Sequence, residues 1–177
     1  MILSDERILE ELGNGNLVIK PFDLKCLGSN SYDVHLFHTI AEYKRPYLDC
    51  KKYNEVEYTT MPECGFMLYP NRLYLGSSVE YTETHGFVPI LEGKSSLARL
   101  GMCIHLTAGK GDEGFCNHWT LEITVIKPLI VYPNMPIGQL IYFALDGEVR
   151  NSYKNKVGAK YNEVTRLPME SQMYKNF

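Results

Sequence analysis

The residue best suited to acid–base chemistry in this sequence is Glu122, which stands in the middle of the alternating segment Trp119–Val125. With a side-chain period of two, the apolar residues of this segment share one face of a strand, and Glu122 shares the opposite face with Thr120 and Thr124. A glutamate placed there can be an ordinary solvent-facing acid of an antiparallel sheet. If it faces a cleft instead, burial raises its pKa and it can act as base and acid in turn.

A second segment with chemical potential is Glu92–Gly101, which reads EGKSSLARLG. It offers Lys94, the hydroxyls of Ser95 and Ser96, and Arg99 at the expected start of a short helix. Backbone N–H groups at a helix start, together with a lysine and hydroxyls, suit a triphosphate. The simpler interpretation is a capped surface turn with ordinary charges, and the segment alone leaves both open.

Three other sequence motifs do not predict a nucleotide-binding or zinc site in this chain. Gly109–Gly114 matches the GxGxxG pattern, but a dinucleotide-binding turn must open a helix, and a loop entering a strand follows here. Gly93–Ser95 resembles the end of a P-loop, yet the first glycine of that motif would fall at Val88. Zinc-dependent deamination needs His-x-Glu and Pro-Cys-x-x-Cys, and neither occurs among the five histidines and five cysteines. Any deamination by this chain is therefore expected to proceed without zinc.

Short strands are expected to position these residues. Thirteen tyrosines and frequent Gly, Pro and Asn breaks are typical of strands, and their even spacing favours a jelly roll or a related distorted barrel. Two helical exceptions are Ser4–Leu12, ending at Gly13, and the inset turn Ser95–Leu100, closed by Gly101. The tail, residues 151–177, has no clear period and is predicted to be a frayed terminus or a mobile flap. The predicted strands are Leu17–Lys20, Ser31–Phe37, Phe66–Tyr69, Leu73–Tyr81, Phe87–Leu91, Met102–Leu106, Trp119–Val125, Leu129–Val131 and Ile137–Phe143.

Composition limits the classes of function. A chain of 177 residues suits one domain, residues 1–177, and 45% hydrophobic with 22% charged residues is ordinary for a globular protein. The net charge of −3 argues against a general nucleic-acid binder, and no apolar run is long enough for a membrane span. Acids near the start argue against a signal peptide, and five scattered cysteines favour reduced thiols. We expect a cytoplasmic protein with no nucleic-acid or membrane partner.

Taken together, the motifs resemble those of the dCTP deaminase family, within the dCTP deaminase and dUTPase superfamily. The longest is Glu92–Gly101, which is similar to the family's G[RK]SSLARLG. Further segments follow the family's order and spacing, so the similarity covers most of the chain. They are Asn30–Leu36 (NSYDVHL), His105–Gly109 (HLTAG), Asp112–Phe115 (DEGF), Trp119–Glu122 (WTLE) and Pro136–Leu140 (PIGQL).

The resemblance implies a mainly β, distorted jelly-roll barrel of the dUTPase-like type, and it implies roles for particular residues. Glu122 would be the catalytic acid and base, while Ser95, Arg99 and the backbone of Ala108 would place the attacking water and the cytosine amine. The implied substrate-binding residues are Lys94, Ser95, Ser96, Tyr153, Lys160 and Tyr161 on the triphosphate, and Asp112 on the deoxyribose 3′-hydroxyl.

The expected reaction is hydrolysis of dCTP to dUTP and ammonia, which would supply dUTP for thymidylate synthesis. Two alternatives stay open: a bifunctional enzyme that releases dUMP and pyrophosphate, and a silent nucleotide-binding regulator on the same fold. Asp112 suits a deaminase and a dUTPase equally, and the expectation of dUTP depends on its simpler role at the sugar.

The resemblance further implies a homotrimer with sites between subunits, Mg²⁺ held by the substrate phosphates with no metal ligands from the protein, and dTTP as a candidate inhibitor. Two positions depart from the family pattern. Gly111 stands where many members have Ile, which predicts a looser loop, and Val164 stands where Gln is frequent, which weakens one expected tail contact.

Overall fold

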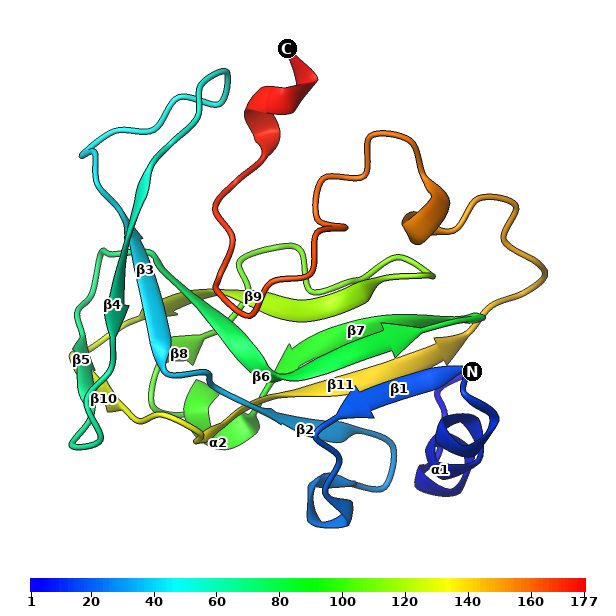
Figure 1. The fold of residues 1–177 in the computed structure, drawn as a ribbon. Helices are drawn as coiled ribbons and strands as arrows, with labels where there is room; N and C mark the ends of the chain where they lie inside the picture. The colour runs from blue at the N-terminus through cyan, green and yellow to red at the C-terminus, as the bar shows by residue number, and fades with distance from the viewer.

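The computed structural model describes residues 1–177 and consists mainly of antiparallel strands (Figure 1). A six-stranded sheet has the order β4-β3-β6-β9-β8, with β1 paired to β6. A three-stranded sheet has the order β2-β11-β7, and β10 pairs with β5. The strands are β1 (Leu17–Lys20), β2 (Tyr32–His35), β3 (Thr39–Tyr43), β4 (Val56–Thr60), β5 (Phe66–Leu68), β6 (Tyr74–Thr84), β7 (Phe87–Gly93), β8 (Met102–Cys103), β9 (Cys116–Val125), β10 (Leu129–Val131) and β11 (Pro136–Ala144).

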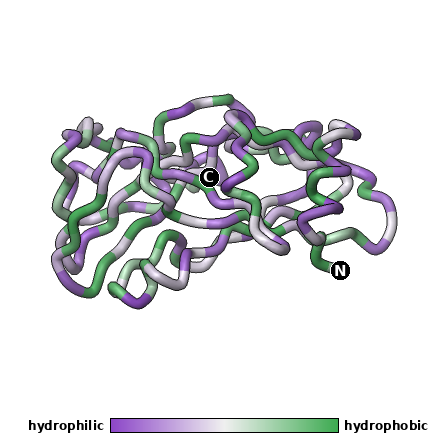
Figure 2. The backbone as a smooth tube through the Cα atoms, turned by 90° about the horizontal axis from the view of Figure 1, so that it is seen from below, coloured by the Kyte–Doolittle hydropathy of each residue, from purple (hydrophilic) through white to green (hydrophobic).

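The mainly β class expected from the sequence is confirmed, and alternating side chains bury one face of the long strands β9 and β11. One cluster of 23 buried residues draws members from Leu3 to Tyr142, and its largest side chains include Tyr32 and Tyr74. Figure 2 shows the same pattern as short hydrophobic and hydrophilic stretches that follow one another along the chain.

The register between β6 and β9 is the part of the fold that positions the site. Leu75 lies opposite Glu122, and Glu83 lies opposite Cys116, with an irregularity between Ser77 and Tyr81. Successive side chains of β9 alternate between half-buried and buried, as the sequence predicts. Glu122 therefore lies on the face away from the core, opposite Leu75 of β6 and two residues before the part of β9 that pairs with β8.

The N-terminal helix α1 (Asp5–Asn14) begins where the sequence predicts, with the Ser4 hydroxyl accepting a hydrogen bond from the Arg7 amide. The helix does not end at Leu12 with Gly13 as its cap, as predicted, but continues through Gly13 to Asn14. Gly15 takes the left-handed capping position, with φ of 77°, and donates to the carbonyls of the last turn. No helix in the structure is both long and apolar enough to cross a membrane.

Two strands, β3 and β4, were not predicted. β4 lies at the edge of its sheet and only Val56 is buried, whereas the first three residues of β3 are all buried, so neither strand shows the alternation expected of a half-buried strand. The inset helix α2 (Ser95–Ala98) is present, but Lys94 occupies its N-cap and no side chain caps it, contrary to the expected serine cap. Gly101, with φ of 83°, closes the segment as expected.

Past β11 the chain forms a tail that lies across the face of β9 (Figure 1, orange to red). It holds only two short 3-10 helices, η2 (Tyr153–Asn155) and η3 (Met173–Asn176); a third, η1 (Leu24–Cys26), precedes β2. Its backbone is attached through side chains of the sheet, as described below. Motion of this tail as a flap stays a prediction.

Candidate active site

A cleft of about 750 Å³ lies between the polar face of β9, the loop of residues 108–115 and the tail. Its volume is in the range typical of small-molecule sites. The apolar part of its wall includes Leu75 on β6 and Leu73 just before that strand. Tyr43, at the end of β3, also lines the cleft. The cleft is therefore lined by apolar and polar side chains together, the polar ones coming from β9, the loop and the tail.

Glu122 lines this cleft and is half-buried. Burial raises the pKa of its carboxyl above the ordinary value of 4.5, while a backbone hydrogen bond from Leu106 and the nearby His105 ring act in the opposite direction. Burial therefore decides the direction of the shift. A carboxyl with a raised pKa, facing a cleft, is suited to accept a proton and return it.

The loop before β9 brings Ala108 and Asp112 to the same cleft as Glu122. The Asp112 carboxylate is exposed and pairs with the Lys110 ammonium, with 2.5 Å between Oδ1 and Nζ. The loop is held to the sheet, since the Leu91 amide donates to the Gly109 carbonyl at 2.7 Å.

The expectation that Gly111 loosens this loop is wrong. Its amide donates to the Pro89 carbonyl at 2.9 Å, and a Cβ placed there would approach Cη2 of Trp119 to 2.7 Å. The absence of a side chain thus permits a close contact between the loop and the buried face of β9, which holds the backbone next to Asp112 against the sheet.

The tail places Tyr153, Lys160 and Tyr161 in the wall of the cleft. The Tyr161 amide donates to the Tyr153 hydroxyl at 3.1 Å, and the Tyr161 hydroxyl accepts from the Gln172 amide at 3.2 Å. These bonds connect both ends of the tail to its middle. Val164, which departs from the family pattern, is 59% exposed and does not line the cleft.

The tail is attached to the sheet chiefly by Asn117, which is buried on β9. Its amide nitrogen donates to the carbonyls of Tyr161 and Glu163 at 3.1 and 2.9 Å, and its oxygen accepts from the Thr165 amide at 3.1 Å. Three further side chains of the sheet each make one hydrogen bond to the tail backbone. The Ser77 hydroxyl donates to the Arg166 carbonyl. The Thr120 hydroxyl accepts from the Met169 amide, and the Tyr43 hydroxyl accepts from the Ser171 amide.

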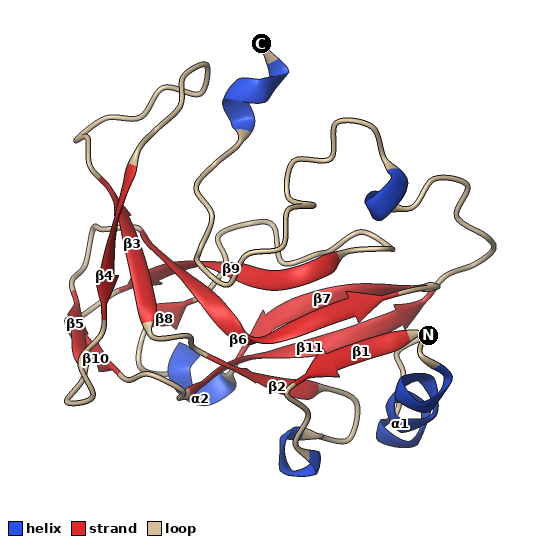
Figure 3. Ribbon diagram, viewed as in Figure 1, coloured by secondary structure: helices blue, strands red, loops and turns tan.

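The remaining four residues implied by the resemblance do not line this cleft: Lys94, Ser95, Ser96 and Arg99 lie on and beside α2. The two serines and Arg99 are exposed, and Lys94 pairs with Asp33 at 2.5 Å. Figure 3 draws α2 below β8 and β9, and the tail above β9. Within one chain, the ten implied residues therefore divide into a cleft group of six and an α2 group of four.

Several cleft residues were missed by the sequence reasoning. Lys110 and Lys156 also line the cleft, so that with Lys160 it carries three lysines. Lys110 lies within the GxGxxG pattern, which was rejected as a binding motif, so the lysine itself was not considered. Lys156 belongs to the lysine-rich tail, where only the composition indicated a binding role. Tyr43 belongs to the unpredicted β3 and had no local signal.

Comparison with known proteins identifies the family. A family model described as dCTP deaminase-like matches residues 2–145. Among solved structures, a chain described as 2′-deoxycytidine 5′-triphosphate deaminase from Agrobacterium tumefaciens superposes with a TM-score of 0.64 at 17% identity. The superposition covers 81% of this chain and 48% of that one, and at this identity it supports the fold alone.

Curated relatives extend the match to the full length. A protein of Clostridium botulinum is 44% identical over 100% of this chain and 99% of its own, and one of Leptospira biflexa is 45% identical over 100% and 98%. A third, from Cytophaga hutchinsonii, is 42% identical over 100% and 99%. All three are named "dCTP deaminase, dUMP-forming". By the family model and by full-length identity, this chain belongs to the dCTP deaminase-like family.

Proposed function

We propose that this protein is a bifunctional enzyme that deaminates dCTP and then hydrolyses the resulting dUTP to dUMP and pyrophosphate, in the cytoplasm. The observation that carries the deaminase part is Glu122, half-buried with a raised pKa in a cleft that also holds Asp112. The sequence favoured release of dUTP. The names of the full-length relatives favour the bifunctional alternative, and we adopt it.

In the proposed deamination, the Glu122 carboxylate accepts a proton from water and passes it to N3 of cytosine, which makes C4 electrophilic. The hydroxide adds to C4, and Glu122 then takes the proton of the new C4 hydroxyl and gives it to the amine, which leaves as ammonia as the C4 carbonyl forms. The balance is dCTP and water to dUTP and ammonia. The backbone of Ala108, in the same cleft, is proposed to hold the water and the amine.

The second proposed step breaks the bond between the α-phosphorus and the β-phosphate bridge, with a second water as nucleophile. Asp112 is proposed to orient this water as well as the 3′-hydroxyl of deoxyribose. Lys110, Lys156 and Lys160 line the cleft and offer positive charge to the triphosphate. Mg²⁺, held by the phosphates, would offset further negative charge during the displacement.

The assembly we propose is a homotrimer in which α2 of a neighbouring copy completes each cleft. The support is that Ser95, Ser96 and Arg99 are exposed and that none of them lines the cleft of their own chain. Arg99 from a neighbour would then favour the ionised form of Glu122, against the effect of burial. Within a single chain, burial dominates.

The test is to supply dCTP and dUTP separately with Mg²⁺ and to measure ammonia and pyrophosphate. The wild-type protein should release both from dCTP, one pyrophosphate per ammonia, and pyrophosphate alone from dUTP. Ammonia without pyrophosphate would show that dUTP is the product, and no ammonia would refute the deaminase assignment.

Glu122→Gln supplies the matched variant, because the proposed role of Glu122 is confined to the base. This variant should release no ammonia from dCTP and should still release pyrophosphate from dUTP. Loss of both reactions in a folded variant would contradict the proposal that Glu122 serves deamination and Asp112 serves hydrolysis of dUTP.

A further inference from the structure

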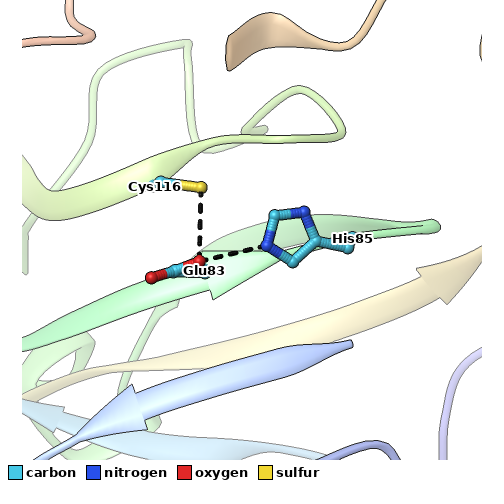
Figure 4. Close-up of side chains that lie close together, drawn as sticks. All are labelled: Glu83, His85 and Cys116. Carbon is cyan, nitrogen blue, oxygen red and sulfur yellow. Dashed lines mark hydrogen bonds and ion pairs between the residues drawn. The ribbon is translucent and has the colours of Figure 1, made fainter. Parts of the chain in front are cut away.

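Outside the cleft, three side chains of different chemistry meet at one end of the paired strands β6 and β9 (Figure 4). They are Glu83 on β6, His85 just past its end, and Cys116 at the start of β9. One potential ligand atom from each lies within 4.8 Å of the others, and all three residues are half-buried. The reaction proposed above uses none of them.

The strands themselves bring these residues together. Glu83 and Cys116 are directly opposite in the antiparallel register, so their side chains share a face, and His85 follows Glu83 by two residues. The Glu83 carboxylate oxygen Oε2 is 3.1 Å from Nε2 of His85 and 3.8 Å from the Cys116 sulfur. Side chains on paired strands hold such a geometry better than side chains on a loop.

A fourth residue orients the cluster. The Tyr81 hydroxyl donates to the other Glu83 oxygen, Oε1, at 2.9 Å, which leaves Oε2 directed at His85 and Cys116. Metal-binding carboxylates in proteins commonly have such a hydrogen-bonded partner. The hydrogen bond with His85 lowers the pKa of Glu83, so that this carboxyl is ionised at neutral pH.

We propose that Glu83, His85 and Cys116 bind a zinc ion, with water in the fourth position. A thiolate, an imidazole and a carboxylate form a ligand set that zinc accepts, and tetrahedral coordination by three protein groups leaves one open place. Binding displaces the thiol proton, and the imidazole then carries its proton on Nδ1. Small side-chain movements bring the three atoms to bonding distance.

This site is distinct from the proposed reaction centre, because none of the three ligands lines the cleft. Zinc here is therefore a structural ion that joins the end of β6 to the start of β9. Its removal should leave the deamination of dCTP intact when Mg²⁺ is in excess, as expected for a reaction without zinc.

The side chain of Lys154, a cation near the proposed zinc site, provides a further test of zinc binding. The Lys154 ammonium, on η2 of the tail, acts electrostatically on both Glu83 and Cys116, although burial raises the pKa of the Cys116 thiol overall. It therefore competes electrostatically with a bound cation. Lys154 is exposed, and its replacement by glutamine removes this charge with little effect on packing.

The experiment titrates the full-length protein with Zn²⁺ in competition with a chromophoric chelator, and repeats it with Co²⁺ to detect thiolate-to-metal charge-transfer absorption. The wild type should bind one Zn²⁺ per chain. Cys116→Ser should lose the charge-transfer band and at least about tenfold in affinity, and Tyr81→Phe should lose about tenfold through its hydrogen bond to the carboxylate. Cys64→Ser is the matched control, because Cys64 is an exposed free cysteine outside the cluster.

Lys154→Gln should bind Zn²⁺ more tightly than the wild type. Affinity equal in Cys116→Ser and Cys64→Ser, or affinity in Lys154→Gln no tighter than in the wild type, would overturn the assignment. Glu83→Gln covers the case in which Cys116→Ser fails to fold, since it keeps the shape of the side chain and should also lose at least about tenfold.

Discussion

Attachment of the tail to β9 depends most heavily on Asn117, and Asn117→Ala tests this dependence. The side chain is 2% exposed and makes three hydrogen bonds to the tail backbone, to Tyr161, Glu163 and Thr165. Alanine removes all three at once. The tail backbone groups then have no partner on the sheet at this point, whereas the strand pairing of β9 is kept.

The magnitude follows from the number of bonds. A hydrogen bond contributes about 1 kcal/mol net to stability, so three bonds correspond to about 3 kcal/mol of tail attachment. Because about 1.4 kcal/mol is a tenfold change in an equilibrium constant, local opening of the tail should increase by about 100-fold. Ser77→Ala is the graded control: it removes one bond, to the Arg166 carbonyl, and should cost about 1 kcal/mol.

The assay is hydrogen exchange of the backbone amides of residues 161–172, followed by mass spectrometry, with the amides of β6 and β9 as an internal reference. Asn117→Ala should accelerate exchange in the tail well beyond Ser77→Ala and leave the reference amides protected. The KM for dCTP should rise as well, because Lys160 and Tyr161 belong to the tail wall of the cleft. Equal exchange in the two variants would refute the reasoning, as would loss of protection throughout the sheet.

Further predictions concern the cleft and its assembly. Glu122→Gln should abolish ammonia release from dCTP while changing dCTP affinity in equilibrium titration by less than about tenfold, since the amide keeps the shape but cannot carry a proton; substantial residual turnover would contradict this. Water can lose its proton only to the ionised form of Glu122, whose pKa burial raises and a neighbouring Arg99 would lower, so kcat/KM of the wild type should fall as the pH drops through the pKa of this carboxyl; a pH–rate profile without this acid limb would count against the assignment. Gly111→Ala should lower the free energy of unfolding by about 1–3 kcal/mol in denaturant titrations, because the new methyl group meets Trp119. Gly13→Ala should raise it by up to about 1 kcal/mol, because Gly13 lies in a helix with open space around it; the reverse order of the two variants would be incompatible with the packing. Inactive Arg99→Ala and Glu122→Gln proteins, mixed under subunit exchange, should recover part of the deaminase activity, and full activity in a strictly monomeric protein would refute a shared site.

Local patterns carried most of the fold prediction. Alternation along Trp119–Val125 placed Glu122 on the correct face of β9, because the side-chain period of a strand is fixed by its backbone. Strands with weak alternation could not be found this way: β4 is mostly exposed and the first residues of β3 are buried in succession. The end of α1 was misplaced because either of two nearby glycines suits a left-handed cap, and only Gly15 adopts it.

The sequence by itself determined the mainly β class, the family and the strand face of Glu122, since these depend on local periodicity and on long motifs. Tertiary structure decided which of the implied residues meet. The cleft collects Asp112, Glu122 and the tail, while α2 faces elsewhere in the same chain. Contacts between residues distant in the chain are set by strand register and packing, which a local pattern does not encode. For the same reason Glu83 and Cys116, separate in the sequence and without any metal motif, become direct neighbours only when β6 pairs with β9.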